Sequence, residues 1–424
     1  MIRISPLITN LIYVLIVYIA FEEFFLKWFP VSDSIYESLL VTSDLFLLVI
    51  FLLYVASGAI NFKSSVSNVI LMIFIFISVI SFLLGQASLP AYFVKMWVLL
   101  RYIFLYFIVI NININKTSLD RFYTILFLCF AAHLFIGCLQ FLDISFINVF
   151  FEAREGASKI IRTEDTIKGT FKFGVFYGFF ILVSFVLLSG RIKKTHWRVL
   201  IYLLALMFGY FSGSRMVFLG LVGFILFTHY RKNKLIIGTS AGLVCLVIYR
   251  SVDFTSIGDI GSMLGLFTLD FWMASLSSGR LGIFNIVPMF FDSDLKTILF
   301  GFSYDGAGIT SFLYRDYDNL SAILQNNAII GIEDVYWVSF LYYFGIFGIV
   351  IFGGFVVNVL FRMKRIAKIA STWEHYSDIK AVTYLMFFAI LCAFVNQIFF
   401  IKTFSFYFWL FAALATHPVR FVKS

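Results

Sequence analysis

Long apolar runs alternate with short polar connections along the chain, and this pattern predicts membrane-spanning helices. Most of the runs are long enough, or nearly so, to cross a bilayer as a single helix. We therefore predict an all-α polytopic membrane protein with about twelve transmembrane helices. The predicted spans lie near residues 7–21, 39–58, 67–85, 96–112, 121–141, 171–190, 199–212, 216–229, 235–250, 335–361, 381–400 and 403–416.

The segment Ser212-Gly213-Ser214-Arg215 decides the topology of everything that follows it. If two spans are separated there, the chain crosses the membrane twice. If one long helix runs through the segment, the chain crosses once, and every later span has the opposite orientation. The basic residues of the short connections favour the split, because with two spans they all fall on one side. They are Arg3, Lys63, Lys116, Arg121, Arg191, Lys193, Lys194, Arg198, Arg231, Lys232, Lys234, Arg362, Lys364, Arg365, Lys368, Arg420 and Lys423. Positive loops mark the cytoplasmic side, so both termini are expected in the cytoplasm.

Two long loops, 142–170 and 251–334, are expected on the opposite, external face. The second holds ten acidic residues and only three basic ones. Its length predicts an ordered cap, with 278–291 as a short helix on the membrane surface and 299–306 as an extended piece and a turn. The chain then divides into 1–250 with spans one to nine, the loop 251–334, and 335–424 with the last three spans.

Composition agrees with a membrane protein and excludes several other classes. Hydrophobic residues make up 62% and charged residues 13% of the chain, and its mean hydropathy is +0.98. The formal charge of +9 lies mostly in short connections, so it indicates topology and not a nucleic-acid partner. There is no nucleotide-binding loop, metal-ligand cluster or nucleophile motif, so we expect no cofactor and no metal. Any chemistry must therefore use an activated substrate on or outside the membrane.

Several basic residues are expected at the external face, where Lys and Arg are least common. They are Lys95, Arg101, Arg215 and Arg250, with Arg280 and Arg315 from the long loop. Snorkelling toward lipid phosphates accounts for any one of them. Together they predict a site for an anionic headgroup. Arg101 and Arg215 are the strongest candidates, because arginine binds phosphate through two parallel hydrogen bonds and Arg215 follows a turn of small residues.

Two further groups of polar residues bear on chemistry. Glu333 and Asp334 precede the span that starts at Val335; they are solvated acids, ion-pair partners of a loop cation, or the source of a general base. Polar residues also lie within or beside spans: His133, Gln140, Asn396, Gln397 and Lys402. His133 is expected to be a hydrogen-bonding residue of the bundle. Asn396, Gln397 and Lys402 are expected to line the same external crevice as the cations.

The chain resembles the bacterial O-antigen polymerase and O-antigen ligase superfamily of membrane glycosyltransferases. One shared element is the turn of small residues and Ser before Arg215 that opens a span, and another is Arg280-Leu281-Gly282 followed by Leu299-Phe300-Gly301-Phe302-Ser303. The third is the span from Asp334-Val335 to Gly345-Ile346-Phe347-Gly348. Ligases have a histidine before such a glycine pair; Asp334 fills that place here, with Glu333 beside it. The resemblance therefore favours the polymerase branch.

The resemblance implies a GT-C-like fold in the bacterial inner membrane, with a long periplasmic loop capping the exofacial side. The implied donor and acceptor are undecaprenyl-diphosphate-linked glycans, and a chain-length regulator is a possible partner. Arg215, Arg280 and Arg101 would hold the diphosphate, and Asp334 or Glu333 would act as the base. Lys95, Arg250, Arg315 and Tyr304 are possible supporting residues. Transfer would need neither nucleotide nor metal.

Three other functions stay open at this point. A ligase would transfer the same kind of donor to lipid A core. A lipid-linked oligosaccharide flippase should have related halves, short external loops and charge deep in a central cavity, and no internal repeat is present in this chain. A membrane scaffold would leave the external cations unexplained.

Overall fold

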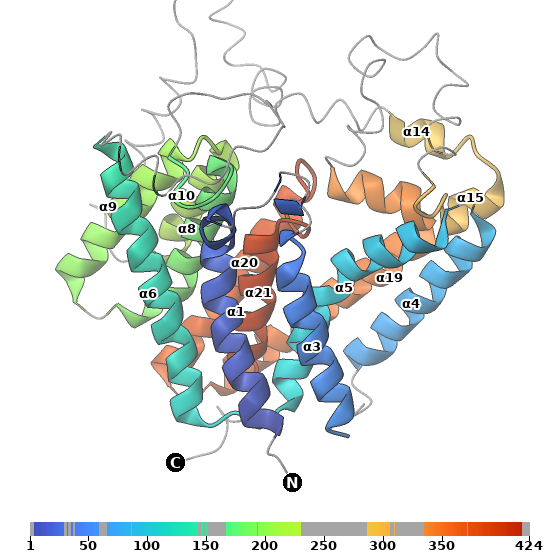
Figure 1. Ribbon diagram of the computed structural model, residues 1–424. Helices are drawn as coiled ribbons and strands as arrows, with labels where there is room; N and C mark the ends of the chain where they lie inside the picture. The colour runs from blue at the N-terminus through green and yellow to red at the C-terminus, as the bar shows by residue number, and fades with distance from the viewer. Residues whose placement is uncertain are drawn as a thin grey trace, which may run out of the picture.

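The structure is a computed structural model, and it describes residues 4–28, 32, 35–36, 39–58, 66–85, 87–142, 146, 150, 167–192, 194–229, 286–305, 309, 335–370 and 372–417. Within these residues the chain forms helices and no strand, as predicted. Figure 1 shows the helices: α1 (Ile4–Lys27), α3 (Thr42–Ala56), α4 (Val66–Leu84), α5 (Leu89–Asn111), α6 (Lys116–Phe141), α8 (Gly174–Leu188), η1 (Ser189–Arg191), α9 (Thr195–Phe211), α10 (Arg215–His229), α14 (Val287–Phe290), α15 (Leu295–Phe300), α19 (Tyr336–Ile369), α20 (Trp373–Cys392) and α21 (Lys402–Ala415).

Hydropathy located these helices well. Every predicted span that falls within the described residues overlaps a helix, whereas 235–250 lies outside them. In the part of the chain that the structure describes, six helical segments are long and apolar enough to cross a membrane: Ser5–Lys27, Val66–Leu84, Leu89–Asn111, Lys116–Phe141, Gly174–Arg191 and Tyr336–Ile369. Thr42–Ala56, His196–Phe211 and Met216–Thr228 are shorter apolar helices. The chain is thus a helical membrane protein, and the number of twelve spans stays a prediction.

The predicted break at Ser212–Arg215 is confirmed as a break between two helices, whereas their crossing of the membrane stays a prediction. Helix α9 ends at Phe211 and α10 begins at Arg215. Gly213 has a φ of +73°, a left-handed conformation that glycine adopts without strain. The Ser214 hydroxyl accepts a hydrogen bond from the Val217 amide at 3.4 Å, which helps to start α10. A continuous helix through this segment is therefore excluded.

Three boundary predictions are wrong, the first being the end of the first span near residue 21, because α1 continues to Lys27. The span expected at 381–400 is the helix Trp373–Cys392, and residues 393–401 form a non-helical connection to α21. At about 1.5 Å per residue, a helix that starts at Trp373 has already risen by roughly the thickness of a bilayer core at Cys392. The extended piece expected from Leu299 is also wrong, because α15 continues to Phe300 and ends at Gly301, whose φ is +75°.

The surface helix expected at 278–291 can be compared with the structure only in part. Its described residues contain the one-turn helix α14 (Val287–Phe290), and the positions before 286 lie outside the described chain. The turn expected after Gly301 is present at Ser303 and Tyr304. Helices α14 and α15 lie beside α4 and α19 at the end of the bundle that is uppermost in Figure 1, called the upper end below.

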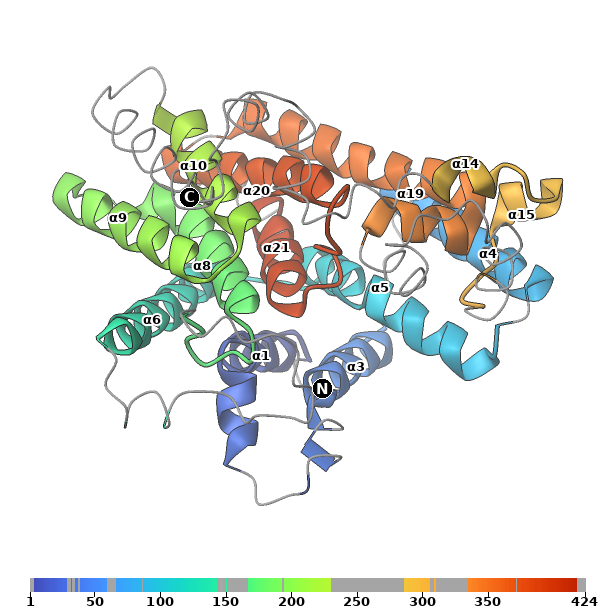
Figure 2. The same cartoon turned by 90° about the horizontal axis from the view of Figure 1, so that it is seen from above.

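The centre of the bundle is α21, which is surrounded by other helices when seen from above (Figure 2). Every residue from Thr403 to Ala415 is buried. The helix is apolar on all sides, which is the pattern of a core helix or a membrane span, and its burial leaves it no lipid face. It packs against α5, α8, α20 and α1. The neighbouring α8 is also almost fully buried, so these two helices form the core around which the others are arranged.

Hydrogen bonds fix which helix ends lie together. At the lower end, the Tyr13 hydroxyl of α1 donates to the Ser118 carbonyl of α6 at 2.8 Å. His417, just after α21, has its Nε2 3.1 Å from the Ile112 carbonyl after α5. The described basic connection around Arg191 and the last turns of α19 lie at this same end, which is the side predicted to be cytoplasmic.

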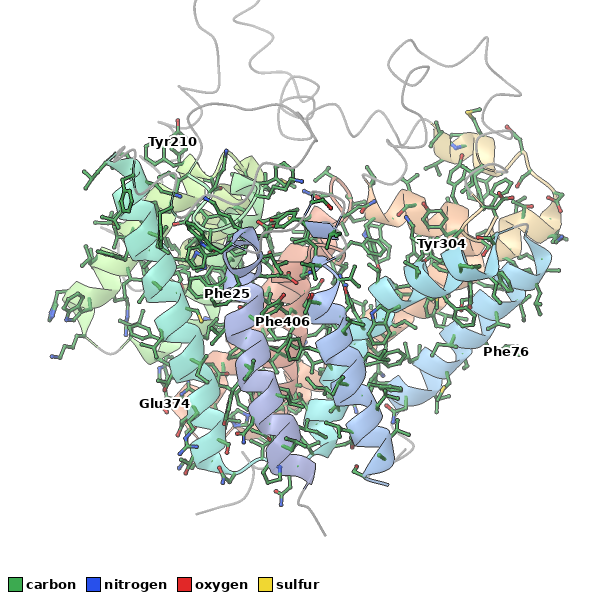
Figure 3. The ribbon with its side chains drawn as sticks, viewed as in Figure 1. Phe25, Phe76, Tyr210, Tyr304, Glu374 and Phe406 are labelled. Atoms are coloured by element: carbon green, nitrogen blue, oxygen red, sulfur yellow. The ribbon has the colours of Figure 1, made fainter. Side chains whose placement is uncertain are left out.

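The outer faces of the bundle are apolar. Large hydrophobic side chains are exposed along α3, α4, α6 and α19, and Phe76 of α4, labelled in Figure 3, is 65% exposed. Contiguous apolar surface of this extent is not found on soluble monomers. It is the surface that lipid chains would cover, so it agrees with a membrane-embedded protein.

Helix α19 bends where α15 is packed against it. Gly345 has a φ of +64° inside α19, and a Cβ atom on this residue would lie 2.5 Å from the Leu299 carbonyl oxygen. A Cβ atom on Gly301 would in turn lie 2.6 Å from the Phe344 amide nitrogen. The two glycines therefore let the backbones of α15 and α19 touch, and the Phe302 amide donates to the Tyr342 carbonyl at 2.8 Å.

Candidate functional site: a polar cavity at the upper end of the bundle

A cavity of about 850 Å³ lies at the upper end between α1, α3, α5, the start of α8 and the connection into α21. We call it the polar cavity. Its charged and amide side chains are those of Glu22, Glu23, Asp44, Arg101, Asn396, Gln397 and Lys402. Aromatic residues, among them Phe173, Phe176 and Phe400, complete its wall. Such a group of ionisable side chains within an apolar bundle is costly unless it is paired or used.

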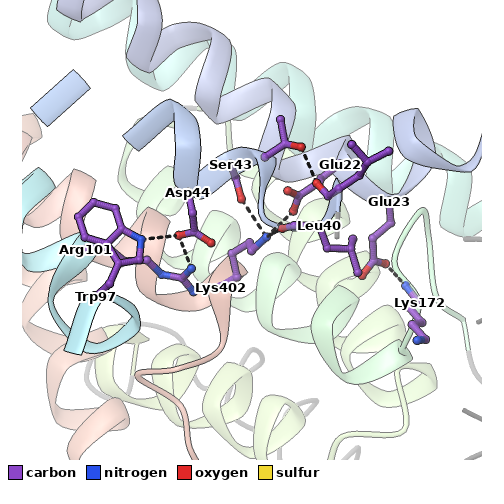
Figure 4. A network of polar contacts seen from close by, with 11 residues as sticks. Glu22, Glu23, Leu40, Ser43, Asp44, Trp97, Arg101, Lys172 and Lys402 are labelled. Atoms are coloured by element: carbon purple, nitrogen blue, oxygen red, sulfur yellow. Dashed lines mark hydrogen bonds and ion pairs between the residues drawn. The ribbon is translucent and has the colours of Figure 1, made fainter. Parts of the chain in front are cut away.

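Lys402, the first residue of α21, ties three helices together at this cavity (Figure 4). Its Nζ donates to the Glu22 carboxylate of α1 at 2.7 Å, to the Leu40 carbonyl at 2.8 Å and to the Ser43 hydroxyl of α3 at 2.8 Å. An ammonium group has three protons to donate, so these bonds use all of them. Lys402 is therefore held rigidly, and the Glu22 carboxylate is its ion-pair partner.

Arg101 of α5 is fixed by Asp44 of α3 (Figure 4). Its guanidinium donates to the Asp44 carboxylate, and the Trp97 indole nitrogen donates to the same oxygen at 3.2 Å. Arg101 is only 6% exposed, and within the described chain its Nε has no hydrogen-bond partner. The side chain thus has one ion-pair partner, and its buried Nε–H is an unused donor.

Glu22 and Glu23 are neighbours on α1, yet both line the cavity. Side chains of consecutive residues on a regular helix point about 100° apart. Helix α1 departs from helical geometry at Phe21, where φ is −123° and ψ is 16°. Just before this break, the Ala20 carbonyl lies 2.9 Å from His133 Nε2 and accepts a hydrogen bond from the Thr170 hydroxyl at 3.2 Å.

His133 thus acts as a hydrogen-bonding residue of the bundle, as predicted. A carbonyl oxygen can only accept, so Nε2 of His133 carries the proton. The imidazole is fully buried and stacks between Phe21 and Phe171, with ring centroids 4.7 Å and 5.1 Å away. His133 does not line the polar cavity. It binds the backbone of α1 at Ala20, close in sequence to Glu22 and Glu23.

The segment 167–173 connects the polar cavity with the turn before α10. At one end, the Ile167 amide donates to the Phe211 carbonyl at 2.9 Å. At the other end, the Lys172 amide donates to the Glu23 carboxylate (Figure 4). In between, the Gln140 side chain holds Gly169 through two hydrogen bonds of 2.8 Å. The start of α10 and the polar cavity therefore share the upper end and are linked by seven residues.

The predicted site residues fall into three groups. The structure brings Arg101, Asn396, Gln397 and Lys402 to one cavity, as the sequence suggested. Arg215 is the first residue of α10, at the same end. The structure describes the backbone of Arg215 but not its side chain. The remaining predicted residues of this group lie outside the described residues: Arg250, Arg280, Arg315, Glu333 and Asp334.

The remaining two predicted residues lie elsewhere. Lys95 is on α5 but does not line the polar cavity. Tyr304 lies at the junction of α15 and α19, away from the cavity wall, where its ring packs against Tyr343 and Phe344 with centroids 4.6 Å and 5.4 Å away. Its position favours a packing role at this junction.

Sequence reasoning missed Glu22, Glu23 and Asp44. A span predicted to end at residue 21 left the two glutamates outside the membrane, although α1 continues to Lys27. The apolar residues that follow them, Phe24, Phe25 and Leu26, were the signal that the helix goes on. Asp44 interrupts an apolar run in the same way. An acid inside such an apolar run requires a cationic partner. The cations near other span ends, Arg101 and Lys402, are the partners that the structure shows.

The polar cavity can bind a ligand that both donates and accepts hydrogen bonds. Its three carboxylates and two cations give a formal charge of −1, and both cations already have a carboxylate partner. The amides of Asn396 and Gln397 can donate and accept. No protein-family model matches this chain, and no curated protein sequence matches it.

Proposed function

We propose that this protein is a membrane glycosyltransferase that polymerises undecaprenyl-diphosphate-linked oligosaccharide repeat units into O-antigen or a related surface polysaccharide. It would act at the periplasmic face of the bacterial inner membrane. The observation that carries the proposal is the polar cavity, which lies at the same end of the bundle as the Arg215 start of α10. Polar groups at that level are where a lipid-linked substrate would present its headgroup and sugars.

The donor diphosphate is assigned to Arg215 and Arg280, with Arg101 in support. Arg215 stands at the N-terminus of α10, where the helix dipole favours negative charge. Arginine also offers phosphate two parallel hydrogen bonds. Arg101 has a lesser share, because Asp44 already neutralises it. Cations fixed there would stabilise the charge that develops as the diphosphate leaves.

The reaction itself is a substitution at the anomeric carbon of the donor. An acceptor hydroxyl oxygen bonds to that carbon while the bond from the carbon to the diphosphate oxygen breaks. The hydroxyl proton passes to a carboxylate, and the lipid diphosphate leaves with the electron pair. Asp334 is the first candidate for this base, and Glu333 is the second. The diphosphate linkage already stores the energy for transfer.

Reconstitution tests the proposal directly. The purified full-length protein is placed in liposomes with the lipid-linked repeat unit extracted from its own bacterium, without ATP. We expect a ladder of lipid-linked polymers on gels. Transfer only when lipid A core is added would identify a ligase, and movement of the repeat unit across the bilayer without bond formation would identify a flippase. Either result would overturn the polymerase assignment.

A further inference from the structure

Two buried groups at the polar cavity have unused hydrogen-bonding capacity. Glu22 is 5% exposed and Arg101 is 6% exposed. Within the described chain, neither Oε1 of Glu22 nor Nε of Arg101 has a hydrogen-bond partner. Buried polar atoms are normally satisfied, and leaving them unsatisfied is costly. One unused acceptor and one unused donor on the same cavity therefore point to a ligand with both kinds of group.

The charges of the cavity argue against a diphosphate as that ligand. Lys402 is committed to Glu22 and Arg101 to Asp44. Glu23, whose side chain accepts the Lys172 amide, adds a third carboxyl group to the wall and no cation. A multiply charged anion would meet these carboxyl groups and no unpaired cation in a site of low dielectric, where repulsion is strong. A neutral ligand avoids this repulsion.

We infer that the polar cavity binds the acceptor sugar of a glycan, through Glu22, Glu23, Arg101, Asn396 and Gln397. Sugar hydroxyls donate to the carboxylates and accept from the amides and from the Arg101 guanidinium, so one ligand uses both kinds of capacity. The apolar C–H face of a sugar ring packs against the ring of Phe173, Phe176 or Phe400. The mixture of apolar wall and few polar groups is that of an orienting ligand site.

This inference rests on the proposed function and changes it in one respect: Arg101 binds the acceptor sugar and not the donor diphosphate. Segment 167–173 joins the cavity, through Lys172 and Glu23, to the turn before Arg215, through Ile167 and Phe211. An acceptor sugar in the cavity would thus lie at the same end of the bundle as a diphosphate held at the start of α10. The cavity, whose two cations each have a carboxylate partner, serves the sugar, and Arg215 and Arg280 are assigned to the anion.

Two inhibitors and two kinds of variant separate these roles in the reconstituted, full-length protein. One inhibitor is the oligosaccharide released from the repeat unit by mild acid, which carries neither lipid nor diphosphate. The other is inorganic diphosphate. Glu23→Gln and Gln397→Leu should each weaken inhibition by the oligosaccharide about tenfold, which corresponds to one lost hydrogen bond of about 1.4 kcal/mol. They should leave inhibition by diphosphate unchanged. Arg215→Lys should weaken inhibition by diphosphate and leave inhibition by the oligosaccharide unchanged.

A control variant and a second test variant guard against effects on folding. Glu374→Gln, the same change at the opposite end of the bundle, should behave like the natural sequence in both inhibition series. If Glu23→Gln fails to fold, Gln397→Leu in the non-helical connection carries the test. Unchanged oligosaccharide inhibition in folded variants, or weakened diphosphate inhibition instead, overturns the inference.

A binding measurement distinguishes failure of the inference from failure of the proposed function. If the natural protein makes no polymer, the proposed function fails, but thermal unfolding with the released oligosaccharide still tests the cavity. A ligand that binds the folded state raises the melting temperature. A rise with the natural protein that Glu23→Gln and Gln397→Leu abolish supports the sugar site. No rise with the oligosaccharide, or a rise with inorganic diphosphate that these variants abolish, rejects it.

Discussion

Replacing Lys402 by methionine should destabilise the protein by about 3 kcal/mol, the lower end of the range for breaking a buried ion pair. The substitution leaves the Glu22 carboxylate, 5% exposed, without its cation, and it removes the donor to the Leu40 carbonyl and the Ser43 hydroxyl. We take the lower end because the Lys402 side chain is 23% exposed, so water can reach part of the site. The folded-to-unfolded ratio would then fall on the order of a hundredfold.

A double-mutant cycle isolates the ion pair from the rest of this effect. Glu22→Gln alone keeps two of the three Lys402 partners and should cost about 1 kcal/mol. The combination of Glu22→Gln with Lys402→Met removes the uncompensated charge, so it should be more stable than Lys402→Met alone. Unfolding in mixed micelles of dodecylmaltoside and SDS, followed by tryptophan fluorescence, measures each difference.

The control is Lys364→Met, at an exposed lysine of α19, for which a change within about 0.5 kcal/mol is expected. Additive single effects, or a Lys402→Met variant as stable as the control, would refute the reasoning. Either outcome would mean that Glu22 and Lys402 do not interact in the folded protein as their 2.7 Å separation indicates.

Three further predictions follow from the fold and the proposed site. Gly345→Ala should cost at least about 2 kcal/mol in the same unfolding assay, because φ is +64° and the new methyl would meet Leu299 backbone; Gly353→Ala, with open space in the same helix, is the matched control and should be neutral or stabilising. Arg215→Lys should lose most polymerisation in liposomes, since lysine keeps the charge but not the two-pronged geometry; near-normal polymer from Arg215→Ala in a normally expressed protein would reject the assignment. Asp334→Asn should abolish turnover while donor binding stays nearly intact; if Glu333→Gln is inactive and Asp334→Asn is not, the base is Glu333, and activity of both amides would exclude a carboxylate base at this position.

The positions of the helices were predictable because hydropathy is local information. The ends of α20 were not. Its first turns contain Glu374, His375 and Asp378, which no hydropathy window includes in a span, yet the Asp378 carboxylate accepts a hydrogen bond from Arg191 at 2.9 Å. Likewise, Gly345 marked a shared motif in the sequence, but the bend of α19 depends on contact with α15, which is a tertiary property.

Residues of the candidate site that lie near the end of a span could be predicted from the sequence. Residues whose role depends on a hydrogen-bond or ion-pair partner far away in the sequence could not. Arg101, Asn396, Gln397 and Lys402 were expected at one crevice from topology alone. The role of Glu22 depends on Lys402, and the break in α1 depends on His133 and Thr170. Separations of more than a hundred residues are invisible to periodicity, and only an unexplained acid in an apolar run hints at them.

The burial of α21 has a consequence for how the chain is made. This helix fills the centre of the bundle, yet it comes later in the sequence than every helix it contacts. During synthesis, α1, α5, α8 and α20 reach the bilayer before the element that their inner faces are shaped to enclose. Until Lys402 arrives, Glu22 and the α3 groups that bind it lack their donor. The space that α21 fills must therefore be occupied by lipid or by a chaperone during synthesis, and the bundle closes only after this last helix has been made.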